Sequence, residues 1–278
     1  MMYDSIIVRC GEMFLKGGNL PYFETKLLQN TRAITGISMI MKTRGRLILS
    51  YFPNHHSLRR IFGISSYSLA VKAEKNLEGI QKTVLTVLDG KPGTFKIETR
   101  RSDKRFPLTS PQISAEVGKY IEAKTKWQFN FAHPDVMIYI EINNRGAYLY
   151  TEMIAGLGGL PVGTAGKVHL IVKSDVDILA GVLMMKRGCT IIPLCIGEEN
   201  DIALLQKFSA QKIRIISLKN KSELNQYIQE KNILLLVSGQ TFEERKESPA
   251  GVIMFRPLVA YTGEEIRKEH EKFRQMAG

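Results

Sequence analysis

The feature that most constrains the fold is the stretch from residue 157 to residue 188. There a glycine-rich segment precedes an apolar strand, a short polar turn and an apolar helix. The strand is predicted over 168–172 and the helix over 178–187. A nearly continuous run of Val, Ile and Leu is typical of a parallel strand that is buried on both faces. This order predicts the first unit of a doubly wound α/β domain, a scaffold that carries many nucleotide sites.

Later segments continue the same pattern. Strand-like runs at 190–195, 212–217 and 233–237 alternate with helical segments at 199–208 and 222–230, and a charged helix is predicted over 263–273. Residues 168–278 therefore predict a Rossmann-like parallel sheet. Ligands of such sheets bind at the carboxyl ends of the strands. Candidate nucleotide-binding residues at these ends are Lys173, Ser174, Asp177, Ser238 and Gly239.

The turn at 173–177 contains no glycine. A loop that wraps phosphates brings several backbone N–H groups close to the ligand, and glycine permits that approach. A carboxylate at Asp175 would also repel a polyphosphate, by roughly 4 kcal/mol at about 4 Å and an effective dielectric constant of about 20. We favour the interpretation that Asp175 and Asp177 cap the helix that follows.

Two smaller α+β units are predicted before this domain. Residues 1–60 carry a strand at 5–9, a helix at 21–32 and a hairpin of strands at 37–42 and 46–52. Residues 61–155 carry helices at 77–88 and 111–123, the second capped by Ser110, and strands at 94–100, 135–143 and 145–153. Residues 156–167 form a glycine-rich linker. Lys42, Arg44 and Arg46 alternate along the hairpin tip, so we expect them to share one face.

The chain is basic, with a formal net charge of +12. Residues 1–60 hold 9 Lys and Arg against 3 Asp and Glu, so half of the excess lies in the first fifth of the chain. Such clustering favours a nucleic-acid partner. A second cluster surrounds a predicted turn and comprises Lys96, Arg100, Arg101, Lys104 and Arg105. The alternative for this cluster is a solvated basic turn.

Several classes of protein are disfavoured by composition. Cys10, Cys189 and Cys195 form no C-x-x-C pair, so neither a zinc site, a redox motif nor a disulfide scaffold is indicated. Scarce cysteine favours a cytoplasmic protein. No apolar run approaches the length of a membrane span, so no membrane partner is expected. The sequence alone assigns no catalytic residue and no metal ligand.

Short motifs in a fixed order resemble one known family. They are Ile7-Val-Arg-Cys-Gly-Glu12, Leu15-Lys-Gly17, Tyr22-Phe-Glu24, Phe62-Gly-Ile64, Phe95-Lys96, Arg101-Ser-Asp-Lys104, Phe106-Pro107, Gly158–Gly163, Leu183–Gly188 and Arg256-Pro-Leu258. The chain resembles the tRNA 4-thiouridine synthetases, sulfurtransferases also linked to thiamine biosynthesis. The resemblance implies an N-terminal ferredoxin-like unit at 1–60, an RNA-binding THUMP domain at 61–155 and a PP-loop ATPase-like domain at 168–278. It also adds Arg256 to the candidate nucleotide site.

The resemblance implies tRNA as the partner, gripped at its acceptor region, and ATP as the cofactor that activates uridine eight before sulfur displaces AMP. Two departures bear on that chemistry. The family's loop Ser-Gly-Gly-x-Asp-Ser corresponds to Lys173-Ser-Asp-Val-Asp-Ile178, in which only Asp177 keeps its residue type. The third domain is also short, and the family's downstream cysteines have no counterpart. The PP-loop therefore reads as degenerate, and we expect no tight binding of ATP.

Two hypotheses follow. In the first, the chain is a tRNA-binding module whose catalysis is lost or supplied by a partner, with a sulfur-donor protein as one such partner. In the second, it is a working ATP-dependent sulfurtransferase with an altered loop. An enzyme of thiazole synthesis acting on small molecules is disfavoured, because the basic THUMP-like half would then have no purpose. The sequence does not determine the oligomeric state, so a homodimer is possible.

Overall fold

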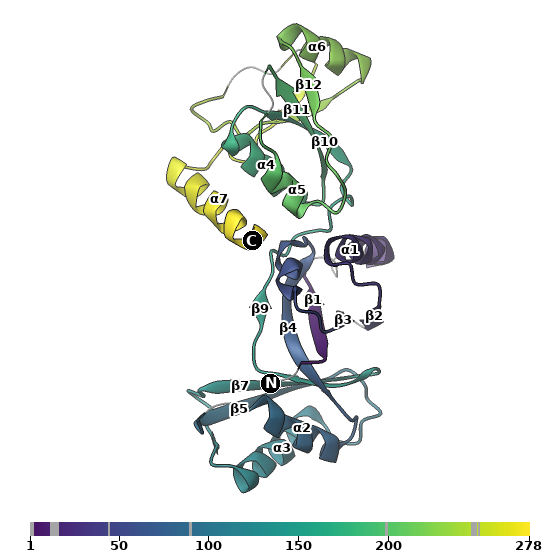
Figure 1. The fold of residues 1–278 in the computed structure, drawn as a ribbon, viewed down its shortest axis with the longest axis vertical. Helices are drawn as coiled ribbons and strands as arrows, with labels where there is room; N and C mark the ends of the chain where they lie inside the picture. Colours follow the sequence, from purple (N-terminus) through teal and green to yellow (C-terminus); the bar gives the residue numbers. More distant parts are fainter. Residues whose placement is uncertain are drawn as a thin grey trace. The chain divides into compact units, whose positions relative to one another are not determined.

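The structure is a computed structural model that describes residues 3–11, 17–43, 45–88, 91–197, 200–245, 249 and 251–278. Contacts divide the chain into two compact units. One unit joins Met1–Arg9, Met39–Pro53 and Ser66–Ala155, and the other joins Cys10–Ser38, Asn54–Ser65 and Gly156–Gly278. The expected combination of α+β and parallel α/β architecture is confirmed (Figure 1). The boundaries expected at residues 60, 155 and 167 stay predictions.

The first unit is built on a mixed sheet. Its strands are β1 (Ser5–Cys10), β2 (Ile40–Thr43), β3 (Arg46–Ser50), β4 (Ile64–Ala73), β5 (Thr94–Arg101), β6 (Gln128–Phe129), β7 (Val136–Asn143), β8 (Gly146–Tyr150) and β9 (Ile154–Ala155). The order is β2-β3-β1-β4-β8-β7-β5-β6, with β9 paired to β4. Strand β5 runs parallel to β6 and β7, whereas β1–β3, β4–β8 and β7–β8 are antiparallel.

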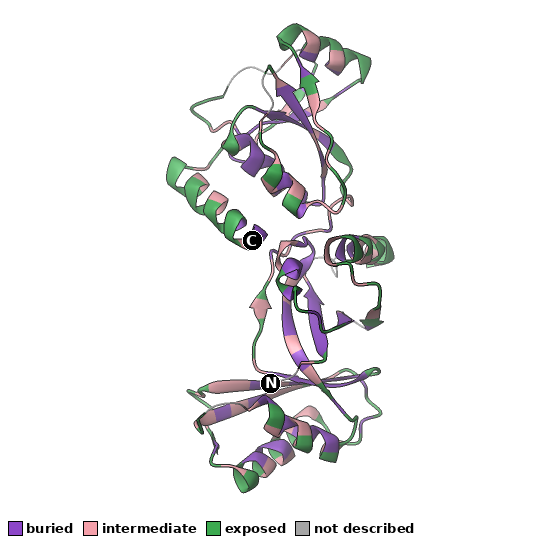
Figure 2. Ribbon diagram, in the orientation of Figure 1, coloured by how far each residue is buried: buried purple, intermediate pink, exposed green. Residues whose placement is uncertain are grey.

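Two helices, α2 (Leu77–Val87) and α3 (Ser110–Lys124), pack against strands β5, β7 and β8 (Figure 1). Their apolar side chains meet Phe95 and Ile138 in a fully buried core (Figure 2). The cap of α3 differs from the prediction. The N-cap is Thr109, whose backbone N–H donates to Gln112 Oε1 at 2.9 Å, and Ser110 is the first helical residue. Thr109 replaces Ser110 because its spacing to Gln112 satisfies a reciprocal capping box.

The hairpin register corrects one prediction about the basic residues. Thr43 pairs with Arg46 and Lys42 pairs with Leu47. Directly opposed residues of an antiparallel pair share a face, so Lys42 lies on the opposite face from Arg46. The prediction failed because alternation along one strand does not continue through a two-residue turn. Arg44 lies outside the described residues.

The second unit contains a parallel sheet in the order β12-β11-β10-β13-β14. Its strands are β10 (Lys167–Val172), β11 (Thr190–Ile196), β12 (Ile216–Leu218), β13 (Leu235–Val237) and β14 (Ile253–Phe255). Strand β10 is central, as expected. Strand β12 is shorter than the predicted run at 212–217, and β14 was not predicted, because three apolar residues beside a loop carry no periodic pattern.

Helices cover both faces of this sheet. They are α4 (Asp175–Lys186), α5 (Ala203–Phe208), α6 (Lys221–Glu230) and α7 (Gly263–Ala277). Leu170 and Val172 of β10 pack in a core with α4, α5 and α7, whereas Ile171 between them packs with α6. This alternation is the period of two that a strand buried on both faces requires.

Two early segments belong to the second unit: α1 (Leu20–Thr35) and the 3₁₀ helix η2 (His55–Arg60). Asn30 Nδ2 of α1 donates to the Val162 carbonyl and the Tyr22 hydroxyl to the Gly163 carbonyl, both at 3.0 Å. The Phe62 ring lies 5.3 Å from that of Phe208. Sequence neighbours of the β2–β3 hairpin thus pack with the C-terminal sheet. Among the described residues, no helix combines the length and apolar character needed to cross a bilayer.

Candidate RNA-binding and nucleotide-binding sites

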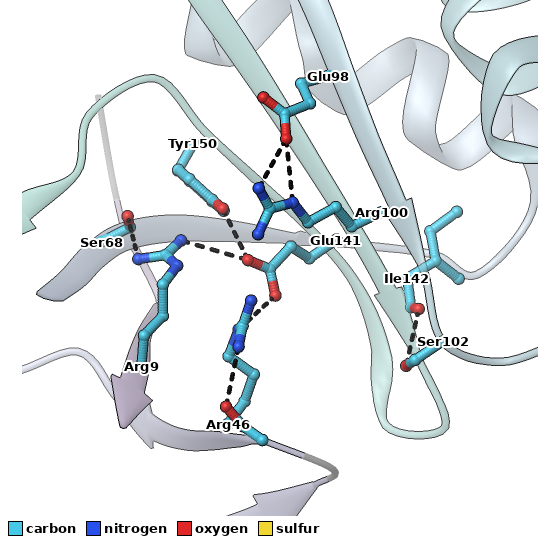
Figure 3. Close-up of polar contacts among 10 residues, drawn as sticks. Arg9, Arg46, Ser68, Glu98, Arg100, Ser102, Glu141, Ile142 and Tyr150 are labelled. Carbon is cyan, nitrogen blue, oxygen red and sulfur yellow. Dashed lines mark hydrogen bonds and ion pairs between the residues drawn. The ribbon is translucent and has the colours of Figure 1, made fainter. Parts of the chain in front are cut away.

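A buried carboxylate, Glu141 of β7, joins side chains of β1, β3 and β8 in the first unit (Figure 3). Its oxygens accept from Arg9 Nη2 at 3.3 Å, Arg46 Nε at 3.0 Å and the Tyr150 hydroxyl at 2.7 Å. Arg9 also donates to Ser68 Oγ at 3.0 Å, and its guanidinium lies 4.8 Å from the centre of the Tyr150 ring. One acid therefore holds two arginines in place.

The pKa of Glu141 reflects these contacts. Burial raises the pKa, but the Arg46 guanidinium, the Tyr150 hydroxyl and Arg9 together lower it below the usual value of a glutamate. Burial beside Glu141 raises the pKa of Tyr150. The glutamate is consequently ionised and the tyrosine neutral at physiological pH, so the network keeps a fixed charge distribution.

A cavity of about 200 Å³ opens beside this network. Its lining residues are Thr43, Arg46, Arg100, Arg101, Ser102, Glu141, Ile142 and Asn143. The lining includes three arginines and one glutamate, so its residues carry a net positive charge. Arg100 is the direct neighbour of Glu141 in the β5–β7 register. Arginine forks match the oxygens of a phosphate, so the chemistry of this cavity suits a phosphodiester group.

The basic turn after β5 is more internally paired than its charge suggests. Arg101 Nη1 donates to the Phe106 carbonyl at 2.6 Å, and Arg105 pairs with Asp103 at 2.9 Å. Hydrogen bonds from Arg105 and Lys75 hold the pKa of the buried Asp103 well below its usual range. Arg101 therefore holds the shape of the turn, and replacing it would disturb the segment around the buried Phe106.

The remaining cations of the turn differ from one another. Arg100 pairs with Glu98 at 2.8 Å, and Lys96 Nζ donates to the Phe131 carbonyl at 3.2 Å. Within the described part of the chain, the Lys104 ammonium has no hydrogen-bonding or ionic partner. Lys104 is thus the member of the cluster most available to an external phosphate.

One feature that the sequence did not single out as functional is the exposed ring of Phe131. It is 71% exposed, and Lys96 Nζ lies 3.9 Å from its centre. An exposed aromatic face beside a cation is a platform on which nucleic-acid bases stack. No periodicity signals it, because Phe131 lies in the loop after β6 rather than in a helix or strand.

In the second unit, a cavity of about 620 Å³ lies at the carboxyl ends of β10, β11 and β13. It is lined by the predicted nucleotide-binding residues Lys173, Ser174, Asp177, Ser238 and Gly239. Strands β11 and β12 lie on one side of β10, and β13 and β14 lie on its other side. The strand order therefore switches direction between β10 and β13, and ligands of open α/β sheets bind at such a switch point. Ile171, Ile196, Leu224 and Met254 supply an apolar part of the wall.

Arg256 is not brought into this lining. Its guanidinium donates to Gln240 Oε1 at 3.1 Å and to the Met254 carbonyl at 3.2 Å. Gln240 does line the cavity, so Arg256 supports the wall through a neighbour. Within the described ranges, no group of three or more His, Cys, Asp or Glu side chains is placed to hold a metal ion.

Asp177 joins two loops rather than simply capping α4. Its carboxylate accepts from the Lys173 N–H at 3.1 Å, the Ser174 hydroxyl at 3.2 Å and the Gly239 N–H at 2.7 Å. A side chain at Gly239 would place its Cβ 2.6 Å from the carbonyl carbon of Val176, so glycine is required there. Backbone N–H groups that face the cavity edge are already bound to this carboxylate.

Asp175 lies elsewhere. Its side chain is exposed and pairs with Arg274 of α7 at 3.0 Å, and it is absent from the lining of the 620 Å³ cavity. The expected repulsion between Asp175 and a polyphosphate is therefore not supported. Asp175 is the first residue of α4, one position before the residues that turn toward the cavity.

Comparison with known proteins identifies both halves of the first 155 residues. The profile of the THUMP domain matches residues 74–152, and that of the ThiI ferredoxin-like domain matches residues 5–68. A probable tRNA sulfurtransferase from Moorella thermoacetica is 43% identical over 203 residues, covering 69% of this chain and 52% of the relative. The counterpart from Geobacillus kaustophilus is 39% identical over 204 residues, covering 69% and 51%. The chain thus spans about half the length of these curated relatives.

Solved structures agree over the whole chain. PH1313 from Pyrococcus horikoshii superposes with a TM-score of 0.84 at 29% identity, covering 98% of this chain and 99% of that one. A 4-thiouridine synthetase, solved as an RNA complex with bound ATP, superposes with a TM-score of 0.79 at 21% identity, covering 99% and 86%. The second likeness shows the shared fold.

Proposed function

The chain belongs to the tRNA sulfurtransferase family, and from that premise we propose that it binds tRNA through its ferredoxin-like and THUMP domains, gripping the acceptor region. The observation that carries this proposal is the 200 Å³ cavity whose lining includes Arg46, Arg100 and Arg101 but a single acidic residue, Glu141. Lys104 and the Lys96–Phe131 pair add a free cation and a stacking surface to the same unit. Phosphates and unpaired bases of an RNA end match these groups.

We further propose that adenylation of the RNA depends on a partner protein. The N–H groups of Lys173 and Gly239 are bound by Asp177, and the turn from 173 to 177 has no glycine to bring further donors to a pyrophosphate. A leaving pyrophosphate needs such donors in the transition state. The second candidate is an ATP-dependent sulfurtransferase complete in itself, which the 620 Å³ cavity at the switch point favours.

We expect tRNA binding to weaken steeply with salt, and the double variant Arg100→Ala/Lys104→Ala to lower the slope of log affinity against log salt by about 2. Each substitution removes one phosphate contact while sparing Arg101 and Asp103, which hold the turn. Fluorescence anisotropy of labelled tRNA at several salt concentrations measures the slope. Lys119→Ala is the control, since this lysine is exposed on α3 and pairs with Glu116. A double variant with the same salt slope and affinity as wild type would contradict the proposal that this turn contacts phosphates.

The full chain is needed for that titration. A truncation near residue 160 would delete the Val162 and Gly163 carbonyls to which Asn30 and Tyr22 of α1 donate. Helix α1 would then lose its partners in the second unit, and a loss of binding could not be assigned to RNA contacts. Point substitutions on exposed side chains avoid this ambiguity.

Incubation with ATP, a sulfur donor, a cysteine desulfurase and unmodified tRNA should yield no 4-thiouridine from this chain. The near-ultraviolet absorbance of the thiolated base reports the product, and equilibrium dialysis with ATP reports nucleotide binding. Turnover in this mixture would establish the second candidate function. Lys173, an exposed lysine on the rim of the cavity, would then be the first residue to replace.

A further inference from the structure

The second unit has another cavity, at the edge of its sheet opposite the 620 Å³ cavity. It measures about 480 Å³ and is lined by the first residues of β10 and β11, by Lys26 and Asn30 of α1, and by the segment from 209 to 216, which ends at the first residue of β12. The first residues of parallel strands lie at the amino edge of the sheet. Because β10 has six residues at about 3.3 Å each, this edge is about 20 Å from the carboxyl edge. The two cavities are therefore separate.

The charge of this second cavity is one-sided. Lys26, Lys167, Lys212 and Arg214 contribute four cationic side chains, and no Asp or Glu is found among its described lining residues. Within the described residues, none of the four has a hydrogen bond or ion pair through its side chain. Elsewhere in the chain, exposed lysines such as Lys268 and Lys272 pair with nearby glutamates. Four unpaired cations around one hollow leave a local positive potential that only an external anion can neutralise.

The cavity also has apolar lining residues and a fixed wall. Val162, Ile191 and Ile213 are the apolar residues that it shares with the cations. Helix α1 is held against the 161–163 segment by the hydrogen bonds of Tyr22 and Asn30. A groove lined by both cations and apolar side chains matches a sugar–phosphate chain, whose phosphates need charge and whose riboses and bases offer apolar faces. Its volume is larger than one phosphate group needs.

We infer that this amino-edge groove, bounded by α1, β10, β11 and the 209–216 segment, binds the sugar–phosphate backbone of the tRNA through a surface that belongs to the second unit. The inference rests on the proposed tRNA-binding function and extends it, because it gives the C-terminal unit an RNA contact that does not require a working nucleotide site. Electrostatic contact at two separate surfaces raises affinity through effective concentration when one RNA reaches both.

The test uses the full chain carrying Lys212→Ala and Arg214→Ala. We expect the affinity for tRNA at about 0.1 M salt to fall about tenfold and the salt slope to fall by about 2. Hydroxyl-radical footprinting should show that a patch of protected backbone is lost while protection at the acceptor end persists. Lys268→Ala/Lys272→Ala on α7 is the matched control, because it removes the same charge from lysines that are already paired.

Each result separates the hypotheses. Wild-type protein that fails to bind tRNA at all would overturn the proposed function itself. Wild-type binding with an unchanged slope in Lys212→Ala/Arg214→Ala would overturn only the groove. The charge-reversed variant Lys212→Glu/Arg214→Glu should lose more affinity than the alanine variant, with an unchanged circular dichroism melting curve.

Discussion

Replacing Glu141 with glutamine should lower the free energy of unfolding of the first unit by about 3 kcal/mol. The substitution keeps the shape of the side chain but removes the only charge that Arg9 and Arg46 share within the described network. Arg9 is 10% exposed at its side chain, so water cannot replace the lost carboxylate. The loss is large because two guanidinium groups lose a carboxylate that they share in a buried setting.

Urea denaturation followed by tyrosine fluorescence or circular dichroism measures this change. Glu98→Gln provides the matched control, since Glu98 also pairs with an arginine but is 43% exposed at its side chain. Exposed pairs contribute less than about 1 kcal/mol, so the control should unfold close to wild type. Equal stability of the two variants would mean that Glu141 is not the organising charge of the unit.

The pKa of Glu141 is lower in the folded protein than its usual value of 4.5. The stability that this carboxylate contributes should therefore be present above about pH 4.5 and decline as the pH falls through its folded-state pKa.

Asp177→Ala should be the most damaging single substitution in the candidate nucleotide site, destabilising the second unit by about 2–4 kcal/mol. It leaves the buried Gly239 N–H and the Lys173 N–H without their carboxylate acceptor. The loop after β13 would separate from the start of α4, and the wall of the 620 Å³ cavity would open. Asp177 is therefore a structural support of the site as well as a lining residue.

Hydrogen exchange read at the Gly239 and Lys173 amides measures this effect locally, which suits a chain of two units better than a single melting temperature. Asp175→Ala, two residues away on the same helix turn, is the control. Its carboxylate is 69% exposed and pairs with Arg274, so we expect a change below about 1 kcal/mol. Unaltered protection of the Gly239 amide in Asp177→Ala would contradict the bridging role.

Acidic residues that look alike in the sequence can have very different roles in the folded protein. Asp175 and Asp177 look equivalent in the sequence, and one lies at the surface while the other joins two loops. Glu141 is one of several acids in a strand-rich segment, and its partners lie up to 132 residues away. Only a residue's distant neighbours decide whether its charge is available to a ligand.

Much of the fold follows from local patterns in the chain. Apolar runs bounded by glycine and polar turns predicted the central strand β10, the helices α2 and α6, and the parallel sheet, because periodicity of apolar residues records which faces are buried. The co-location of five candidate nucleotide-binding residues was predicted in the same way, since parallel strands bring their carboxyl ends to one edge. Lys173, Ser174, Asp177, Ser238 and Gly239 meet there.

Tertiary structure decided the rest. Short strands such as β14 carry too few residues for a period, and α1 joins the C-terminal unit through single hydrogen bonds to Val162 and Gly163 that no local pattern encodes. The two-residue turn placed Lys42 and Arg46 on opposite faces. The sequence by itself determined the fold class and the number of positive charges. Which of those charges are already paired, and which face an open groove, depends on contacts between residues far apart in the chain.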